Sequence, residues 1–273
     1  MTVGYTEFSF AYAFTENLLG ALAPTGAPTF PNLVQEASLG YDVAIDLPVR
    51  PLFFQFKLPA LLQRKSAKEL KTHGLPLRLP FFRMSLMRRD QSDQHRLLID
   101  LETRFPSLVY YASPRMQNNR SFNRNYLARD VHRATAFVSP AAIGPLPDDK
   151  PHTIAYERQG TVGWMCSQPS PLDVLPFEKV LERTSAALDR PSDRFEVDLA
   201  EIGREIDETI RSRRGIEPDG LRDAIRERRE ARPPPDMDAR SRGVALEMLV
   251  QRDLARSALG VELVFAQPQR PGS

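Results

Sequence analysis

The chain carries a short run of polar residues whose types suit the cleavage of a phosphodiester bond. In chain order they are Glu36, Asp42, Gln55 and Lys57. Such cleavage needs a divalent cation, which activates a water molecule and offsets the charge of the phosphate. Carboxylate and amide oxygens are ligands that Mg²⁺ or Mn²⁺ accepts, and a nearby lysine can stabilise the charge of the transition state. The four residues are therefore candidates for one metal-dependent hydrolytic site.

Two predicted strands bring these groups together. One strand is expected at Tyr41–Leu47, with Asp42 near its start. The next is expected at Leu52–Leu58, where Gln55 and Lys57 occupy alternate positions and so point to one face. Adjacent strands lie about 4.8 Å apart, so these side chains can converge on one ion. A functional role is favoured because a Gln and a Lys in an otherwise apolar strand are costly without partners.

A purely structural interpretation of the same residues stays open. Asp42 would then cap the turn after Gly40. Gln55 and Lys57 would lie on a solvated edge strand, with the aliphatic stem of the lysine along apolar surface. Asp46 shares a strand face with Asp42 and is an alternative metal ligand.

The flanking segments predict a mixed α/β fold. Apolar residues at three- and four-residue spacings predict a helix over Glu7–Leu22, and a short strand is expected around Leu33–Glu36. Beyond the two central strands, Ser92–Phe105 is predicted as a helix with Ser92 as its cap. A strand at Leu108–Ala112 follows. The predicted order is α-β-β-β-α-β.

In this order, and in Asp42 with Gln55-Phe56-Lys57, the chain resembles the PD-(D/E)XK (restriction-endonuclease-like) nuclease superfamily. It looks most like the branch with a QxK third motif, met in nuclease domains of bacterial antiphage systems. The resemblance covers roughly residues 5 to 114. Here Gly-Tyr-Asp replaces the usual Pro-Asp, and a Gln stands at the usually acidic position.

The resemblance implies a central sheet flanked by helices and a Mg²⁺- or Mn²⁺-dependent endonuclease that cuts DNA, with a defence role by analogy. It implies that Asp42 is the central metal ligand and that Gln55 binds the metal through its carbonyl. Lys57 would be the catalytic lysine. Glu36, or else Glu16, would supply a further carboxylate. Gln94 would match a helix-borne glutamine near the site.

A block of positive charge follows the candidate site. Between Lys57 and Arg133 there are sixteen Lys or Arg against six Asp or Glu, in a chain whose formal net charge is only +2. Such concentration is a possible polyanion footprint, although arginines scattered over solvated faces are the commoner explanation. The block is predicted to hold a basic amphipathic helix at Leu61–Lys71, a loop at Met116–Asn125 and a short helix at Tyr126–His132. The candidate phosphate-binding residues are Arg64, Lys65, Lys68, Arg88, Arg89, Arg115, Arg120 and Arg124.

The remaining sequence bounds the class of protein. We expect an α/β core over residues 1–172 and a charged, mainly helical region over residues 173–273 that ends in a strand. The absence of a long apolar run or a basic leader predicts a cytoplasmic chain with no membrane partner. Cys166, the single cysteine, is expected to be a buried, inert thiol. His95 and His132 are isolated and are expected to be ordinary structural histidines.

Two alternatives to a nuclease remain. One is a non-catalytic module on the same fold that binds nucleic acid or protein. The other is a subunit of a larger assembly, or a homo-oligomer. In the second case the predicted amphipathic helices Phe195–Arg211 and Val244–Ala258 would form the interface, although packing on their own core is the default.

Overall fold

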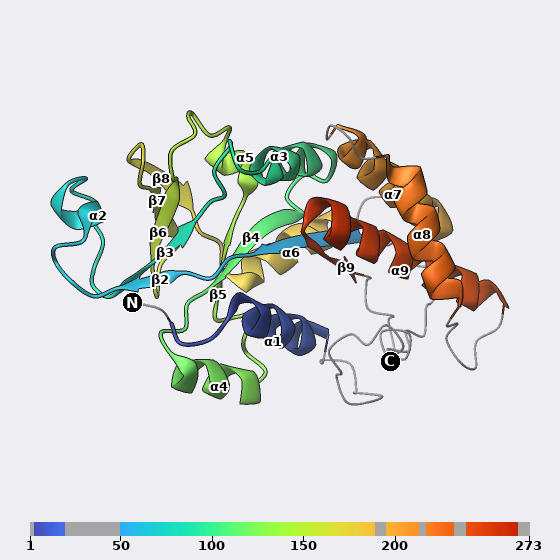
Figure 1. Ribbon diagram of the computed structural model, residues 1–273. Helices are drawn as coiled ribbons and strands as arrows, with labels where there is room; N and C mark the ends of the chain where they lie inside the picture. Colours follow the sequence, from blue (N-terminus) through green and yellow to red (C-terminus); the bar gives the residue numbers. More distant parts are fainter. Residues whose placement is uncertain (1–2, 20–49, 189–194, 213–216, 232–238, 267–273) are drawn as a thin grey trace. The chain divides into compact units, whose positions relative to one another are not determined.

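The computed structural model describes residues 3–19, 50–188, 195–212, 217–231 and 239–266 (Figure 1). The chain divides into two compact units. The first comprises residues 1–21 and 54–182, and the second comprises residues 22–53 and 183–273. The predicted strands Leu33–Glu36 and Tyr41–Leu47 lie outside the described residues. The described part confirms a mixed α/β protein with helices flanking its sheets and a helical C-terminal region.

One sheet of the first unit contains the strand that carries the candidate lysine motif. Three neighbouring strands of this four-stranded sheet, in spatial order, are β5 (Thr135–Val138), β4 (Val109–Pro114) and β1 (Arg50–Phe56). Strands β4 and β5 are antiparallel, with Ala112 opposite Phe137. All six residues of β4 are buried, as expected for a strand covered on both faces. The predicted strands Leu52–Leu58 and Leu108–Ala112 are both confirmed, within two residues at each end.

Helix α1 (Glu7–Leu19) packs on this sheet through aromatic rings. The ring of Phe14 lies 5.1 Å from Phe54 and 5.3 Å from Phe56, and 6.0 Å from Phe137 of β5. Phe10 makes an edge contact with Phe56 at 5.5 Å. These five rings are the centre of the core, and each large ring removes much apolar surface from water.

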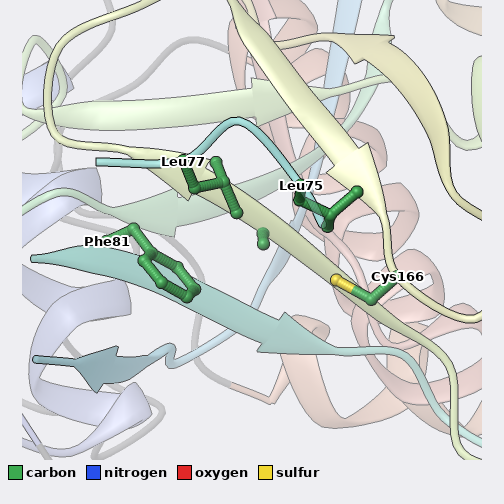
Figure 2. Close-up of a cluster of buried hydrophobic side chains, with 5 residues drawn as sticks. Leu75, Leu77, Phe81 and Cys166 are labelled. Atoms are coloured by element: carbon green, nitrogen blue, oxygen red, sulfur yellow. The ribbon is translucent and has the colours of Figure 1, made fainter. Parts of the chain in front are cut away.

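A second sheet of the first unit is an antiparallel set of five strands. In spatial order the strands are β2 (Ala60–Leu62), β3 (Phe81–Ser85), β6 (Thr153–Glu157), β7 (Val162–Met165) and β8 (Ser170–Asp173). Strands β6 and β7 form a hairpin around Gly160. Figure 2 shows a buried cluster against this sheet, in which Cys166 lies with Leu75, Leu77 and Phe81. The thiol is buried, as predicted, and burial raises its pKa.

Gly163 of β7 occupies a place where no side chain fits. A Cβ atom there would lie 2.6 Å from Cγ2 of Val174 and 3.1 Å from the carbonyl oxygen of Ala155. The valine therefore fills the space that a residue larger than glycine would need.

Helix α3 (Gln94–Arg104) confirms the predicted helix and buries Leu97, Leu98 and Leu101. Its Glu102 is buried and fixes the start of a short helix, α5 (Pro140–Ile143). The Glu102 carboxylate accepts hydrogen bonds from Ser139 Oγ at 2.7 Å and from the Ala141 N–H at 2.8 Å. A carboxylate at the start of a helix satisfies N–H groups that have no partner inside the helix.

Three predictions in the basic block are wrong. The expected short helix Tyr126–His132 is helical only at Tyr126 and Leu127, which end α4, and turns follow. The expected helix Leu61–Lys71 is instead strand β2 followed by a single helical turn, α2 (Lys68–Lys71). Pairing of β2 with β3 buries Leu61 and overrides the local helical pattern. The expected loop after Met116 is helix α4 (Asn119–Leu127). Asn118 begins it with a reciprocal capping box: its side chain accepts from the Ser121 N–H at 2.9 Å.

The second unit is mostly helical. Helices α7 (Phe195–Arg211) and α9 (Ala239–Leu254) confirm the predicted helices Phe195–Arg211 and Val244–Ala258, and α8 (Pro218–Glu230) lies between them in the chain. Helix α6 (Phe177–Leu188), which precedes them, was not predicted. A π-helical turn extends α9 to Leu259, and Gly260 ends it in the left-handed conformation. The predicted final strand follows as β9 (Glu262–Ala266).

Ion pairs between helices accompany the apolar contacts of the second unit. The Arg222 guanidinium donates to Asp207 at 2.9 Å and to Glu247 at 2.8 Å. Arg229 donates to Asp253 at 2.6 Å. These groups link α7, α8 and α9. Among the described residues, no helix is long and apolar enough to span a bilayer.

Candidate functional site

Three side chains of the predicted site meet in one hydrogen-bonded chain. Lys57 Nζ donates to Gln94 Oε1 at 3.0 Å, and Gln94 Nε2 donates to Gln55 Oε1 at 2.8 Å. Gln55 Nε2 in turn donates to the Phe56 carbonyl at 3.2 Å. Gln94 therefore bridges the two polar residues of the QxK motif. We call Gln55, Lys57 and Gln94 the amide–lysine cluster.

The arrangement follows from two local structures. Gln55 lies near the end of β1, and Lys57 directly follows that strand, so alternation places both side chains on one face. Gln94 is the first residue of α3, and its backbone N–H donates to Ser92 Oγ at 3.1 Å. A residue in the first helical turn has an N–H without a helical acceptor, and the serine hydroxyl satisfies it.

The backbone of Lys57 is fixed by β4 and by the second sheet. Its N–H donates to the Ala112 carbonyl at 3.0 Å, and its carbonyl accepts from Ser113 Oγ at 2.7 Å. Tyr156 of β6, whose side chain is buried, donates its hydroxyl to Ser113 Oγ at 2.7 Å. The base of the lysine is thus held rigidly, and only its side chain is left to adjust.

The ammonium of Lys57 is partly buried and is held by an amide. Burial lowers the pKa of Lys57, and the negative charge of Glu7 partly opposes that shift. Glu7 also accepts the Leu58 N–H through Oε2 at 3.0 Å. Within the described ranges, no carboxylate lies within ion-pair distance of the ammonium. Among the residues that the structure describes, the cluster therefore presents a positive charge without a direct ion-pair partner.

Two contributors to this environment, Glu7 and Ser113, were not predicted from the sequence. Glu7 was not selected, although an acid in the first turn of a helix predicted to cover the sheet was a usable signal. Ser113 follows the predicted strand Leu108–Ala112, but its contact with Tyr156 depends on which strands become neighbours. No local pattern contains that information.

The proposed metal ligands are only partly described. Glu36 and Asp42, as well as the alternative ligand Asp46, lie outside the described residues. Glu16 of α1 is described, and its Oε2 accepts from Asn17 Nδ2 at 2.6 Å. Among the residues that the structure describes, no three His, Cys, Asp or Glu side chains form a group able to hold a metal. Gln55 Oε1 accepts one hydrogen bond and retains a second lone pair, which suits an oxygen-preferring ion such as Mg²⁺.

Five of the eight candidate phosphate-binding residues are exposed and have no ion pair with a described residue. Arg64 and Lys65 lie in the turn before α2, Lys68 begins α2, and Arg120 and Arg124 lie on α4. These segments are distinct parts of the first unit, and α2 extends beyond the edge strand β2 (Figure 1). They can contact phosphates without first breaking a strong internal bond.

The other three arginines are already engaged. Arg88 donates to the Asp149 carbonyl and to Asp90, and Arg89 donates to the Asp149 carboxylate at 2.8 Å. Such exposed pairs contribute only about 0–1 kcal/mol, so a phosphate could replace them. Arg115 differs, because Nη1 donates to the carbonyls of Arg158 and Gly160 while Nε and Nη2 are buried without a partner. Its guanidinium holds the turn of the β6–β7 hairpin through these two bonds, so Arg115 is not among the proposed phosphate contacts.

His95, expected to be structural, is a satisfied core residue. The distance from His95 Nδ1 to the Tyr111 hydroxyl oxygen is 2.8 Å, and the distance from Nε2 to the Gly144 carbonyl oxygen is 2.9 Å. Burial lowers its pKa. His132 packs against the Phe177 ring at 4.5 Å, and burial lowers its pKa as well.

Comparison of the whole chain with models of known protein families, with curated proteins and with solved structures found no match.

Proposed function

We propose that this chain is a metal-dependent nuclease that hydrolyses phosphodiester bonds, with DNA as the substrate, and that it acts in the cytoplasm, in defence against phage. The observation that carries the proposal is the amide–lysine cluster. A partly buried ammonium is held by a glutamine amide, which leaves its charge available to a phosphate. In a water-poor site, such a charge stabilises a negative transition state better than it does in bulk solvent.

Each residue of the cluster has a chemical task in this proposal. Lys57 stabilises the charge that builds on the phosphate oxygens, and its fixed backbone keeps the ammonium in place. Gln94 orients the ammonium and the carbonyl of Gln55 together. Mg²⁺ or Mn²⁺ bound by Asp42, Glu36 and the Gln55 carbonyl would supply water activation and charge neutralisation.

The exposed basic residues fit the same function. Arg64, Lys65, Lys68, Arg120 and Arg124 would hold the substrate backbone by charge, without reading sequence. Their contribution should weaken as salt rises, because phosphate contacts release bound counterions. Phosphate contacts lose most of their strength between about 50 and 200 mM salt. If affinity for duplex DNA does not change over this range, the exposed basic residues do not bind the substrate backbone.

A binding module without catalysis is the second candidate function. It is favoured by one observation, the amide of Gln55 at a position where the resembled family has an acid. A neutral ligand holds a divalent cation less strongly than a carboxylate does. The two candidates share the basic surface and differ only in turnover.

The test is cleavage of plasmid DNA with Mg²⁺ or Mn²⁺. Folded Lys57→Ala should cut at least roughly 100-fold more slowly than wild type, as for other charge-stabilising groups. Its DNA affinity should be nearly unchanged, because many cations share the phosphate contacts. Lys71→Ala, an exposed lysine of α2, is the matched control and should cut normally. Wild-type protein that binds DNA but never cuts it would favour the binding module.

A further inference from the structure

A second group of polar side chains, separate from the amide–lysine cluster, lies at one end of the β6–β7 hairpin. His152, just before β6, has its Nδ1 2.6 Å from Ser167 Oγ. Its Nε2 lies 3.1 Å from the Asp148 carboxylate and 3.2 Å from the Asp148 carbonyl oxygen. Serine, histidine and aspartate are thus in hydrogen-bond contact in the order that nucleophilic catalysis uses.

The surroundings of His152 fix which ring nitrogen carries the proton. Both groups that face Nε2, a carboxylate and a carbonyl oxygen, can only accept a hydrogen bond. In the neutral ring the proton is therefore on Nε2, and Nδ1 has a free lone pair. Ser167 Oγ then has to donate its hydrogen to Nδ1. This is the orientation that a general base requires.

The group is rigid on one side and open on the other. The side chain of His152 is 1% exposed, and its carbonyl accepts the Leu86 N–H at 2.9 Å. The neighbouring backbone is fixed by the bond from the Cys166 N–H to the Thr153 carbonyl, also at 2.9 Å. Ser167 is exposed, in the turn that follows β7. A nucleophile open to solvent is thus joined to a buried base.

Asp148 is ionised at neutral pH. The Lys150 N–H donates to its Oδ1 at 2.8 Å, and this bond is the main cause that lowers the pKa of Asp148. A carboxylate in contact with Nε2–H stabilises the imidazolium that would form when the ring takes a proton.

We propose that Ser167 is an activated nucleophile that attacks carboxylic esters, with His152 as its general base and Asp148 as the residue that orients the base. The serine proton moves to His152 Nδ1 while Oγ bonds to the acyl carbon. The ester C–O bond then breaks, and the departing alcohol takes that proton. Water, deprotonated by the same nitrogen, releases the carboxylic acid and restores the serine. This activity is independent of the proposed nuclease site.

The experiment uses the full chain with two probes, a fluorophosphonate and p-nitrophenyl acetate. The fluorophosphonate should form an adduct at Ser167, located by peptide mass spectrometry, with loss of fluoride. The acetate ester should give a burst of p-nitrophenol with a stoichiometry of one per chain. Ser167→Ala should abolish both signals. Ser170→Ala, an exposed serine of β8, is the matched control and should leave both unchanged.

Two further variants separate an activated serine from an ordinary exposed one. His152→Gln should slow adduct formation by roughly 10²- to 10⁴-fold, the usual contribution of a general base. Asp148→Asn should slow it less, because the Asp148 backbone carbonyl still holds the Nε2 proton. Should His152→Gln fail to fold, the Asp148 variant decides alone. No adduct at Ser167, or equal rates in wild type and a folded Asp148→Asn variant, would overturn the proposal.

Discussion

Replacing Gln94 by leucine would remove the bridge of the amide–lysine cluster with little change in side-chain volume. Gln94 Oε1 accepts from Lys57 Nζ at 3.0 Å, and its Nε2 donates to Gln55 Oε1 at 2.8 Å. Leucine makes neither bond. The Lys57 ammonium would turn toward solvent, while the carbonyl of Gln55, a residue only 7% exposed, would lose its donor.

The expected loss of stability follows from these two bonds. A hydrogen bond to a charged group contributes about 1.5–3 kcal/mol, and a buried acceptor left without a donor costs about 1–3 kcal/mol. Water can reach the ammonium in part, so the lower half of the first range applies. We expect the free energy of unfolding of the first unit to fall by about 2.5–5 kcal/mol. In a unit of this size that is a fall in Tm of roughly 5–20 °C.

The measurement is thermal and urea unfolding of the full chain, followed by the DNA cleavage assay. Gln91→Leu is the control, because the Gln91 side chain is exposed three residues earlier, and it should change stability by no more than about 0.5 kcal/mol. If Gln94→Leu unfolds like wild type, the cluster does not exist in solution as described. If it is destabilised but cuts DNA at the wild-type rate, Gln94 only stabilises the fold.

Three further predictions concern the fold. Phe14→Ala should destabilise the first unit by about 3–5 kcal/mol, because the fully buried ring contacts four other rings; an unchanged urea midpoint would contradict this. His95 has a folded-state pKa below its unfolded value, so its contribution to stability should be complete above about pH 6.5 and should decline as the pH falls below that value. The slope of stability against pH between 6.5 and 5 should therefore be smaller in His95→Gln, and equal slopes would show that the ring is not buried as described. Arg222→Met should lower the stability of the second unit by roughly 1–3 kcal/mol, since Asp207 and Glu247 lose a shared cation in a partly exposed site, and chemical unfolding of the variant measures it.

The sequence predicted best those elements whose pattern is long and local. Helices α3 and α7 have apolar residues at helical spacing over three turns or more, and their ends were predicted to within two residues. The amide–lysine cluster was also within reach of prediction. Alternation along one strand puts Gln55 and Lys57 on a shared face, and Gln94 begins a helix that the family resemblance had already placed near them.

Contacts distant in sequence are the main physical cause of the failures, and an unusual local cap is another. The segment from Leu61 to Lys71 has a helical pattern, but Leu61 gains more by pairing opposite Phe82. Helix α4 was missed because its cap uses Ser121 in place of the usual Glu or Gln, and because the ring of Phe122 is held by Tyr5 at 4.6 Å. The contact between His152 and Ser167 likewise depends on the register of a hairpin.

Gly163 of β7 and Val174, which faces it, constrain each other's substitution during evolution. Position 163 has no room for a methyl group while position 174 is a valine, and the same methyl group would lie 3.1 Å from the Ala155 carbonyl oxygen. A chain descended from a common ancestor can therefore enlarge residue 163 only after residue 174 has become smaller. The order of the two mutations matters, because a chain that enlarges residue 163 first has a side chain that clashes with Val174. Correlated substitution at these two positions would identify distant relatives even where Lys57 and its neighbours had changed.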